Sequence, residues 1–221
     1  DVVLADGPLA FWRFGESSGA TAHDSSGNGR DATYVETITY GVTGALAGDD
    51  DTAVRFTDTG ADVHHDMDFD DFDGNEPYTL ECWFRADRYD SAHLHIFNKD
   101  FTGGNGRHNI GIFVHADQQL GFERIISSVK HQATAPLPIV NAWSHIVGTY
   151  DGAELRIYVD ADLKEAVPDT RAQDSKDVPT YVGAKGTGYG VLPGSLDEFA
   201  IYDYALSAAR VQAHHDAGRG L

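Results

Sequence analysis

The chain has 221 residues, of which 41% are hydrophobic and 11% aromatic, so it can build a packed core and is not a largely disordered protein. Acidic residues outnumber basic ones by 35 to 16, and the net charge of −19 argues against nucleic acid as a partner. No run of about 18 apolar residues occurs, so membrane insertion is not expected. The acidic excess is compatible with high salt, calcium-rich surroundings or a genomic composition bias.

The predicted elements are short strands rich in β-branched and aromatic residues, separated by Gly, Asp, Asn and Pro. Their number and spacing predict an all-β fold, a two-sheet antiparallel jelly-roll sandwich that occupies residues 1–221 as one domain. In chain order the strands are Leu9–Phe14, Ala32–Glu36, Ala53–Phe56, Asp62–His65, Tyr78–Phe84, His93–Asn98, Asn109–Val114, Leu120–Ile126, Trp143–Tyr150, Glu154–Val159, Thr180–Val182 and Leu196–Tyr202.

The clearest local signals lie in the second half of the chain. The dipeptide Asp151-Gly152 between two strands predicts a hairpin. One short helix is predicted from Ser207 to about Asp216, with Ser207 as N-cap and Gly218 near the C-cap. Ala208 and Val211 are predicted to face inward. The predicted core includes Leu80, Trp83, Ile146, Ile157, Phe199 and Ile201.

The cysteine content does not identify the cellular compartment of the protein, because Cys82 is the only cysteine and no intrachain disulfide can form. Its apolar surroundings predict a buried thiol. The chain has no initiator Met and no signal-sequence pattern, which indicates an excised or processed piece of a larger protein.

Six segments in order resemble the laminin-G-like family of the concanavalin A-like lectin/glucanase superfamily. They span nearly the whole chain, and the exit segment 194–207, GSLDEFAIYDYALS, is the most specific. The others are the entry PLAFWRFGE (8–16) with DSSGNGRDATY (24–34), then AVRF (53–56), YTLECWF (78–84), NAWSHIVGTYDG (141–152) and LRIYVD (155–160).

The resemblance implies a non-catalytic binding module that recognises a glycan or cell-surface receptor outside the cell or on a virion surface. The opening segment LADGPLAFW (4–12) is similar to modules of secreted microbial enzymes and of viral tail or surface proteins. Fold alone does not give function, because this superfamily includes lectins, adhesion modules, glycosidases and lyases.

A structural calcium site is expected at Asp24, Gly27, Asn28 and Asp197. Oxygen atoms of the turn that Asp24 opens can converge on a hard cation. Asp197 can complete the site because first and last strands of a jelly roll commonly run side by side, and the resemblance implies calcium held in this way. The alternative is that Asp24 is an Asx-turn residue and Asp197 pairs with an arginine such as Arg13.

The acidic segment Asp66–Asn75 is a candidate for a second, weaker ion. It lacks the glycine and glutamate of a calcium-binding EF-hand loop, and a solvated loop is the alternative.

Ligand contacts are expected from Tyr89, His93, His95 and Tyr189. Aromatic rings can stack on sugar faces. His93 and His95 share one face of a strand, so they can donate hydrogen bonds to a sugar, hold a transition metal, or be exposed strand histidines. Trp12 is a further aromatic candidate, but its place within the entry strand favours burial in the core, and His145 is interpreted as a packing residue.

Catalysis is not expected. A retaining glycosidase needs two carboxylates about 5 Å apart. Glu76 and Glu81 are an odd number of residues apart, and Asp197 and Glu198 are adjacent, so each pair is expected to diverge. Two rivals to the binding module stay open: a structural or oligomerisation domain of a surface assembly, and an unrecognised glycan-cleaving enzyme.

Overall fold

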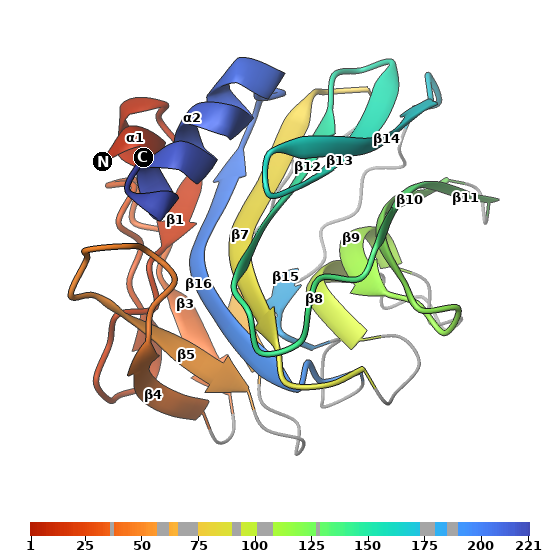
Figure 1. Cartoon of the computed structure of the whole chain (residues 1–221). Helices are drawn as coiled ribbons and strands as arrows, with labels where there is room; N and C mark the ends of the chain where they lie inside the picture. Colours follow the sequence, from red (N-terminus) through yellow and green to blue (C-terminus); the bar gives the residue numbers. More distant parts are fainter. Residues whose placement is uncertain are drawn as a thin grey trace.

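Two antiparallel sheets lie face to face in the computed structural model, which confirms the predicted sandwich (Figure 1). The structure describes residues 1–35, 38–56, 62–65, 75–89, 94–100, 108–126, 129–172, 180–184 and 190–221. Within these residues each sheet has eight strands, and all neighbouring strands are antiparallel.

The first sheet contains the first and the last strand of the chain. Its order is β14 (Asp162–Pro168), β13 (Glu154–Val159), β12 (Ser144–Tyr150), β7 (Tyr78–Ala86), β16 (Gly194–Tyr202), β5 (Thr52–Phe56) and β4 (Ile38–Thr43), with β1 (Ala10–Trp12) paired to β16.

The second sheet is built from the middle of the chain and from short strands near its start. Its order is β11 (Val129–Pro136), β10 (Gln119–Ile126), β9 (His108–Val114), β8 (Leu94–Asp100), β15 (Thr180–Val182), β6 (Asp62–His65), β3 (Ala32–Val35) and β2 (Thr21–Ala22).

The entry and exit strands lie side by side, as predicted. β1 pairs with β16 through Ala10 opposite Ile201, and Trp12 is opposite Phe199. The rings of Trp12 and Phe199 stack with centroids 5.9 Å apart, and both side chains are fully buried. Trp12 is therefore a core residue and not an exposed sugar platform.

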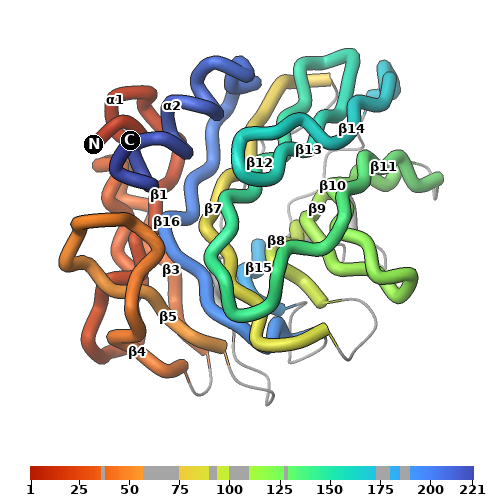
Figure 2. Tube along the Cα trace, viewed as in Figure 1, coloured from red at the N-terminus to blue at the C-terminus, as the bar shows by residue number. Residues whose placement is uncertain are grey.

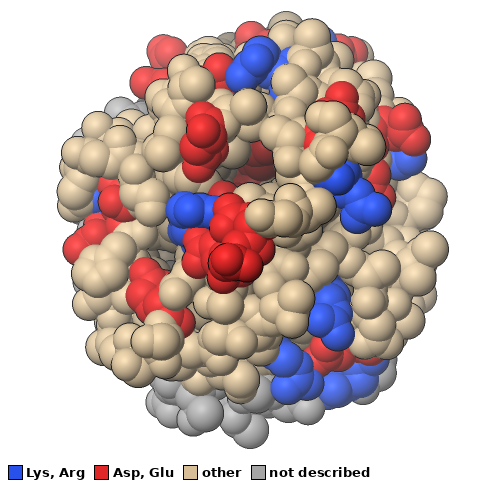
Figure 3. All heavy atoms as spheres, turned by 60° about the vertical axis from the view of Figure 1, so that its left-hand side comes forward, with Lys and Arg blue, Asp and Glu red and all other residues tan. Residues whose placement is uncertain are grey.

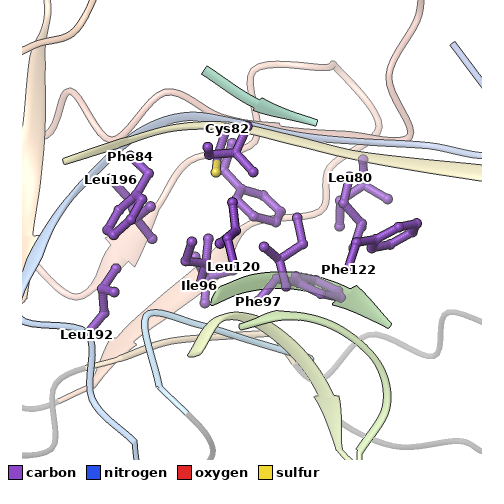
Figure 4. Packing of buried hydrophobic residues seen from close by; sticks show 14 of the residues in the cluster. Leu80, Cys82, Phe84, Ile96, Phe97, Leu120, Phe122, Leu192 and Leu196 are labelled. Carbon is purple, nitrogen blue, oxygen red and sulfur yellow. The ribbon is translucent and has the colours of Figure 1, made fainter. Parts of the chain in front are cut away.

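The main core fills the space between the sheets (Figure 4). Side chains of one sheet meet those of the other, because alternate residues of each strand face the same side. Leu80, Cys82 and Phe84 project from β7, and Ile96, Phe97, Leu120 and Phe122 meet them from the second sheet. Cys82 is fully buried, as its apolar surroundings predict.

A second, smaller apolar layer covers the outer face of the first sheet. The helix α2 (Ala208–Arg219) lies on this face beside the short helix α1 (Val2–Ala5), so the two ends of the chain are close together (Figures 1 and 2). Buried Val211 of α2 packs in a cluster with Phe11, Val147 and other residues of the sheet.

The helix runs one turn beyond its predicted end. Ser207 is the N-cap, as predicted, and its hydroxyl accepts a hydrogen bond from the backbone N–H of Arg210. Gly218 lies near the C-cap, as predicted, and the C-cap itself is Gly220 in the left-handed conformation. The prediction that Ala208 faces inward is wrong, because Ala208 is exposed. Gly218 lies inside the helix, and its lack of a side chain allows close packing on Trp83, because a Cβ there would come within 2.4 Å of the Trp83 ring.

The predicted hairpin and core residues are confirmed. Strands β12 and β13 join through Asp151-Gly152, and Gly152 has a φ of +90° that glycine adopts without strain. The six predicted core residues, Leu80, Trp83, Ile146, Ile157, Phe199 and Ile201, are all buried.

Truncation of a core side chain should measure how much the sandwich depends on its inter-sheet packing. Ile157→Ala should lower the free energy of unfolding by about 2–5 kcal/mol, because it leaves a cavity in a fully buried site. Leu163→Ala on the adjacent strand is the control, and its half-exposed side chain should cost less than about 1 kcal/mol. Urea denaturation measures both, and equal losses would contradict the assigned face.

Candidate functional site

The turn at Asp24 is closed by its own hydrogen bonds. The Asp24 carboxylate accepts four of them, at 2.8–3.0 Å, from the backbone N–H groups of Phe11, Ser26 and Arg30 and from the Ser26 hydroxyl. Burial raises the pKa of Asp24, but these donors outweigh it and hold the pKa below its ordinary value. This is the hydrogen-bonding pattern of the Asx-turn alternative.

Asn28 in the same turn also has hydrogen-bond partners. The Asn28 amide donates to the carbonyl oxygens of Pro8 and Leu9, at 3.1 Å each, and Gly27 has a positive φ of 86°. These contacts fix the turn against the segment that leads into β1. They use the amide nitrogen of Asn28, whereas a cation would bind the amide oxygen, so calcium binding at Asn28 stays a prediction.

Asp197 lies elsewhere, on β16. Its Oδ2 accepts a hydrogen bond from the backbone N–H of Ala45 at 2.7 Å, and its buried Oδ1 has no hydrogen-bond partner in the described structure. Burial raises the pKa of Asp197 to about 7. No hydrogen bond or ion pair among the described residues joins Asp197 to the Asp24 turn.

Arg13, the alternative partner proposed for Asp197, pairs with the neighbouring residue Glu198 instead. Arg13 Nε donates to Glu198 at 2.8 Å, and Arg13 Nη2 lies 3.0 Å from Asp49 and 3.2 Å from Asp51. Across the described part of the chain, no three His, Cys, Asp or Glu side chains are arranged to hold a metal ion. Calcium binding therefore stays a prediction.

Only part of the expected ligand set can be located. Tyr89 is half-buried, packs against the core and donates its hydroxyl hydrogen bond to the Pro138 carbonyl at 3.0 Å. His95 is buried against the Phe113 ring, with centroids 4.6 Å apart, so the alternative of an exposed strand histidine is wrong for it. His93 and Tyr189 lie outside the described residues, as does 66–74 of the acidic segment.

A β-bulge in β16 changes the geometry of two acidic residues. The strand register shifts between Asp197 and Ala200, and Glu198 has a φ of +51°. Asp197 is opposite Trp83, which faces outward, and Glu198 lines the same outer face. The expectation that the two carboxyl groups diverge is therefore wrong, because the bulge adds a residue to the alternation. Burial and the charge of Asp197 raise the pKa of Glu198 to about 8.

Strand β7 also buries a carboxylate on its outer face. Glu81 alternates with the core residues Leu80 and Cys82 and is only 2% exposed. It accepts hydrogen bonds from Tyr202 OH at 3.0 Å and has contacts with His145 Nε2 at 2.7 Å and His214 Nδ1 at 2.9 Å. Burial alone would raise the pKa of Glu81, but the two histidines lower it to about 2.

His214 links this carboxylate to a second one. Its Nε2 lies 3.0 Å from Asp6, which also accepts a hydrogen bond from Arg210 Nε at 2.6 Å. Both ring nitrogens of His214 face carboxylates, so the imidazole donates from both when it is protonated. Burial lowers the pKa of His214, but Glu81 and Asp6 raise it above the ordinary value. We call Asp6, Glu81, His145, Tyr202, Arg210 and His214 the histidine cluster.

A pocket of about 270 Å³ lies between the histidine cluster and the ion pairs of Arg13. Glu81, Trp83, Glu198 and His214 are its buried walls, whereas Arg13 and Asp49 are partly exposed. Figure 3 views the side of the molecule that carries α1 and β1, where acidic and basic side chains adjoin beside a hollow. The full lining is Asp1, Val2, Val3, Arg13, Leu46, Asp49, Glu81, Trp83, Glu198, His214, Ala217 and Gly218.

Only weak signals in the sequence point to these residues. Glu81 is the one charged residue in the strand segment Tyr78–Phe84, which hints that it has partners, since a charge is rarely buried alone. His145 does pack, with its ring 5.1 Å from that of Trp83, but it also contacts Glu81, so its interpretation as packing alone is incomplete.

Comparison with known families decides the relationship. Residues 49–212 match a laminin G model described as the Concanavalin A-like lectin/glucanases superfamily. The chain belongs to this superfamily. The match covers well over half of the chain and confirms the resemblance carried by the sequence segments. No curated protein matches the sequence.

Solved structures share the fold of this superfamily member at low sequence identity. A Trypanosoma rangeli sialidase in complex with 2,3-difluorosialic acid matches with a TM-score of 0.72 and 13% identity, over 95% of this chain and 33% of that one. The binding domain of botulinum neurotoxin serotype G matches at 0.67 and 15%, over 94% and 50%. The binding domain of Paraclostridial Mosquitocidal Protein 1 matches at 0.69 and 16%, over 96% and 52%. The chain thus spans about a third to a half of these relatives.

The histidine cluster should stabilise the laminin-G-like sandwich in a pH-dependent way. Glu81→Gln should lower the free energy of unfolding by about 3–5 kcal/mol at pH 7, because it removes one partner of a buried ion pair. The contribution of Glu81 is present above its ordinary pKa of 4.5 and is lost as the pH falls towards about 2. The difference between wild type and variant should therefore shrink between pH 5 and pH 3.

The matched control is Glu154→Gln, whose partly exposed carboxylate pairs with Arg156 and should contribute less than about 1 kcal/mol. Urea denaturation at pH 7, 5 and 3 measures both variants. A difference for Glu81→Gln that stays constant across these pH values would contradict the assigned ion pairs.

Proposed function

We propose that this chain is a non-catalytic binding module that holds a group of a glycan or cell-surface receptor in the pocket beneath α2, outside the cell or on a virion surface. The observation that carries the proposal is the combined lining of the pocket. Trp83 supplies an aromatic wall, while Asp49, Glu198 and Arg13 supply hydrogen-bond acceptors and donors. Such a mixture is typical of sites that orient a small polar ligand.

The fold relationships support a binding role. Two of the similar solved structures are themselves binding domains, of botulinum neurotoxin serotype G and of Paraclostridial Mosquitocidal Protein 1. In each case the matching part is about half of the solved chain. By analogy we propose that this chain too is one module of a larger protein or assembly. No helix in the described residues is long and apolar enough to cross a membrane.

The carboxylates of the pocket are engaged in ways that favour binding over catalysis. Both oxygens of Glu81 contact partners of the histidine cluster, and Glu198 is paired with Arg13. A nucleophile or general acid must reach the reacting bond, and these partners would have to be displaced first. We therefore propose that the pocket binds its ligand without cleaving it.

Blocking the pocket should abolish binding. Ala217 is an exposed residue of α2 that lines the pocket, so Ala217→Phe places a ring at its mouth without disturbing the core. Ala209→Phe is the matched control, because Ala209 is exposed on the same helix but does not line the pocket. On a glycan array and on intact cells, Ala217→Phe should weaken binding at least about tenfold, whereas Ala209→Phe should bind as wild type.

Wild-type binding that survives Ala217→Phe would contradict the pocket as the ligand site. It would direct attention to the expected ligand residues Tyr89, His93, His95 and Tyr189, which lie on other parts of the chain and stay a prediction. Absence of binding to every glycan and cell type would contradict the binding function itself and favour a structural domain.

We also propose that calcium stabilises the module, through Asp197. The support is its buried Oδ1 without a hydrogen-bond partner, in a carboxyl group whose pKa burial raises to about 7. At higher pH the ionised group carries a buried charge that backbone N–H groups and Arg13 offset only in part, and a cation would offset more of it. The other expected ligands give less support, because Asp24 already accepts four hydrogen bonds.

Calcium should then raise the melting temperature at pH 8, when ionic strength is matched with sodium chloride. At a free calcium concentration of a hundred times the dissociation constant, the added stability is about 2.7 kcal/mol. Asp197→Asn should abolish the calcium-dependent shift, while Asp151→Asn on the exposed hairpin should retain it. Identical melting curves in calcium and sodium would show that the proposed site is wrong.

A further inference from the structure

His214 joins the end of the chain to its beginning. Its Nδ1 lies 2.9 Å and 3.0 Å from the two carboxylate oxygens of Glu81 on β7, and its Nε2 lies 3.0 Å from Asp6, which follows α1. Only 1% of the His214 side chain is exposed, so the ring has almost no contact with water. The imidazole therefore links α2 both to the first sheet and to the N-terminal segment, residues 1–7.

This double contact needs a protonated imidazole. A neutral imidazole carries one N–H, and its other nitrogen presents a lone pair that repels a carboxylate at hydrogen-bond distance. Burial lowers the pKa of His214, but the charges and hydrogen bonds of Glu81 and Asp6 raise it above its ordinary value. His145 differs, because only its Nε2 contacts a carboxylate, so a neutral ring is sufficient for that contact.

Burial decides which contact is lost when His214 gives up a proton. The side chain of Glu81 is only 3% exposed, so the remaining N–H stays on Nδ1, where it satisfies this carboxylate. The side chain of Asp6 is 17% exposed and keeps a second partner, Arg210, whose Nε donates to it at 2.6 Å. Asp6 then faces the bare Nε2 of a neutral ring, and the link between α2 and residues 1–7 weakens.

Titratable groups surround His214 on every neighbouring element. Those that contact His214 or its partners are Glu81 of β7, His145 of β12, Tyr202 of β16, Tyr204 after β16, Asp6 after α1 and Arg210 of α2. Asp1, Arg13, Asp49 and Glu198 line the pocket beside it. Burial and the charge of Asp197 raise the pKa of Glu198 to about 8. Glu198 therefore ionises at mildly alkaline pH, where His214 loses its proton, and an experiment has to separate the two.

The N-terminal segment also forms a wall of the pocket beneath α2. Val2 and Val3 of α1 line this pocket together with residues of α2, which lies beside α1 (Figures 1 and 2). Val3 is partly buried against the small apolar cluster on the outer face of the first sheet, whereas Leu4 is 40% exposed. Helix α1 has only four residues and none of them is fully buried, so its attachment depends on few contacts. Loss of the contact between Asp6 and His214 therefore loosens this wall.

We propose that His214 is a pH-operated latch on the pocket: its imidazolium, held between Glu81 and Asp6, keeps residues 1–7 closed against α2, and its neutral form lets this wall open. The inference rests on the proposed function, because it describes the regulation of the same pocket. The contribution of the latch is complete below the ordinary histidine pKa of 6.5 and is lost as the pH rises through the raised pKa of His214. The pocket should therefore be closed at pH 6 and more open at pH 9.

Thiol labelling measures access to this wall without any ligand. Val3→Cys places a thiol in the wall, and Leu4→Cys places one on the exposed face of the same helix. Cys82 is fully buried and should not react in either variant. Both variants are labelled with iodoacetamide, an uncharged reagent, from pH 6 to pH 9, and the ratio of their rates removes the common effect of thiolate formation. The rate of Val3→Cys relative to Leu4→Cys should rise at least about fivefold over this range, the effect of one lost hydrogen bond.

Three further substitutions, each combined with the two thiol variants, locate the latch. Asp6→Asn removes the carboxylate that needs the second proton, and His214→Gln removes the titrating ring while it leaves the pair of Asp6 and Arg210 in place. In both, the rate ratio should be high already at pH 6 and should not change up to pH 9. Asp216→Asn is the matched control, because it removes a carboxylate beside His215, the neighbouring histidine of α2, and should keep the full pH dependence. Thermal melts verify that each variant is folded.

The outcomes separate the latch from other sources of pH dependence and from the proposed function. A rate ratio that stays constant from pH 6 to pH 9 without further substitution would overturn the latch. A rise that persists in Asp6→Asn and in His214→Gln would also overturn it and would assign the pH dependence to another group such as Glu198. Labelling needs no ligand, whereas Ala217→Phe tests binding itself, so the latch and the binding function can fail independently.

Discussion

The burial of Glu81 is the constraint on which the outer face of this protein depends. β7 is a central strand of the first sheet, and its outer face is covered by α2 and not by water. A carboxylate in that position is tolerated only with partners that satisfy its charge and its lone pairs. Those partners are His145, Tyr202 and His214, which come from β12, β16 and α2. The helix is therefore held by a buried ion pair as well as by apolar packing.

This arrangement joins the ends of the chain. Asp6 follows α1 and contacts both His214 and Arg210 of α2, while β1 pairs with β16 directly before that helix. The same face carries a second set of charges, where the bulge in β16 turns Asp197 and Glu198 to one side. The pocket lies between the two sets, so its walls are polar although the sheet below it belongs to the core of a sandwich.

The two raised pKa values on the bulge have a consequence opposite to that of Glu81. A carboxyl group whose pKa rises on folding stabilises the native state most at a pH below its ordinary pKa, and this contribution is lost as the pH rises from the ordinary value to the raised one. The contribution of Asp197 and Glu198 is therefore complete below their ordinary pKa values of 3.8 and 4.5 and is lost as the pH approaches about 7 and 8. Glu81 contributes fully above its ordinary pKa of 4.5, and His214 contributes fully below its ordinary pKa of 6.5. The contributions of the histidine cluster and of the bulge therefore overlap best near about pH 4–5.

The sequence alone determined the architecture, because apolar alternation, turn residues and the entry and exit motifs are local properties of the chain. It also determined the hairpin at Asp151-Gly152 and the N-cap at Ser207. It missed the short helix α1 and the strands β2, β4, β11 and β14, which lie at the edges of the sheets and have few buried side chains. The pocket was decided only by tertiary structure. Asp6, Glu81 and His214 are distant in sequence, and a one-residue bulge, invisible to a strict alternation, sets where Glu198 points.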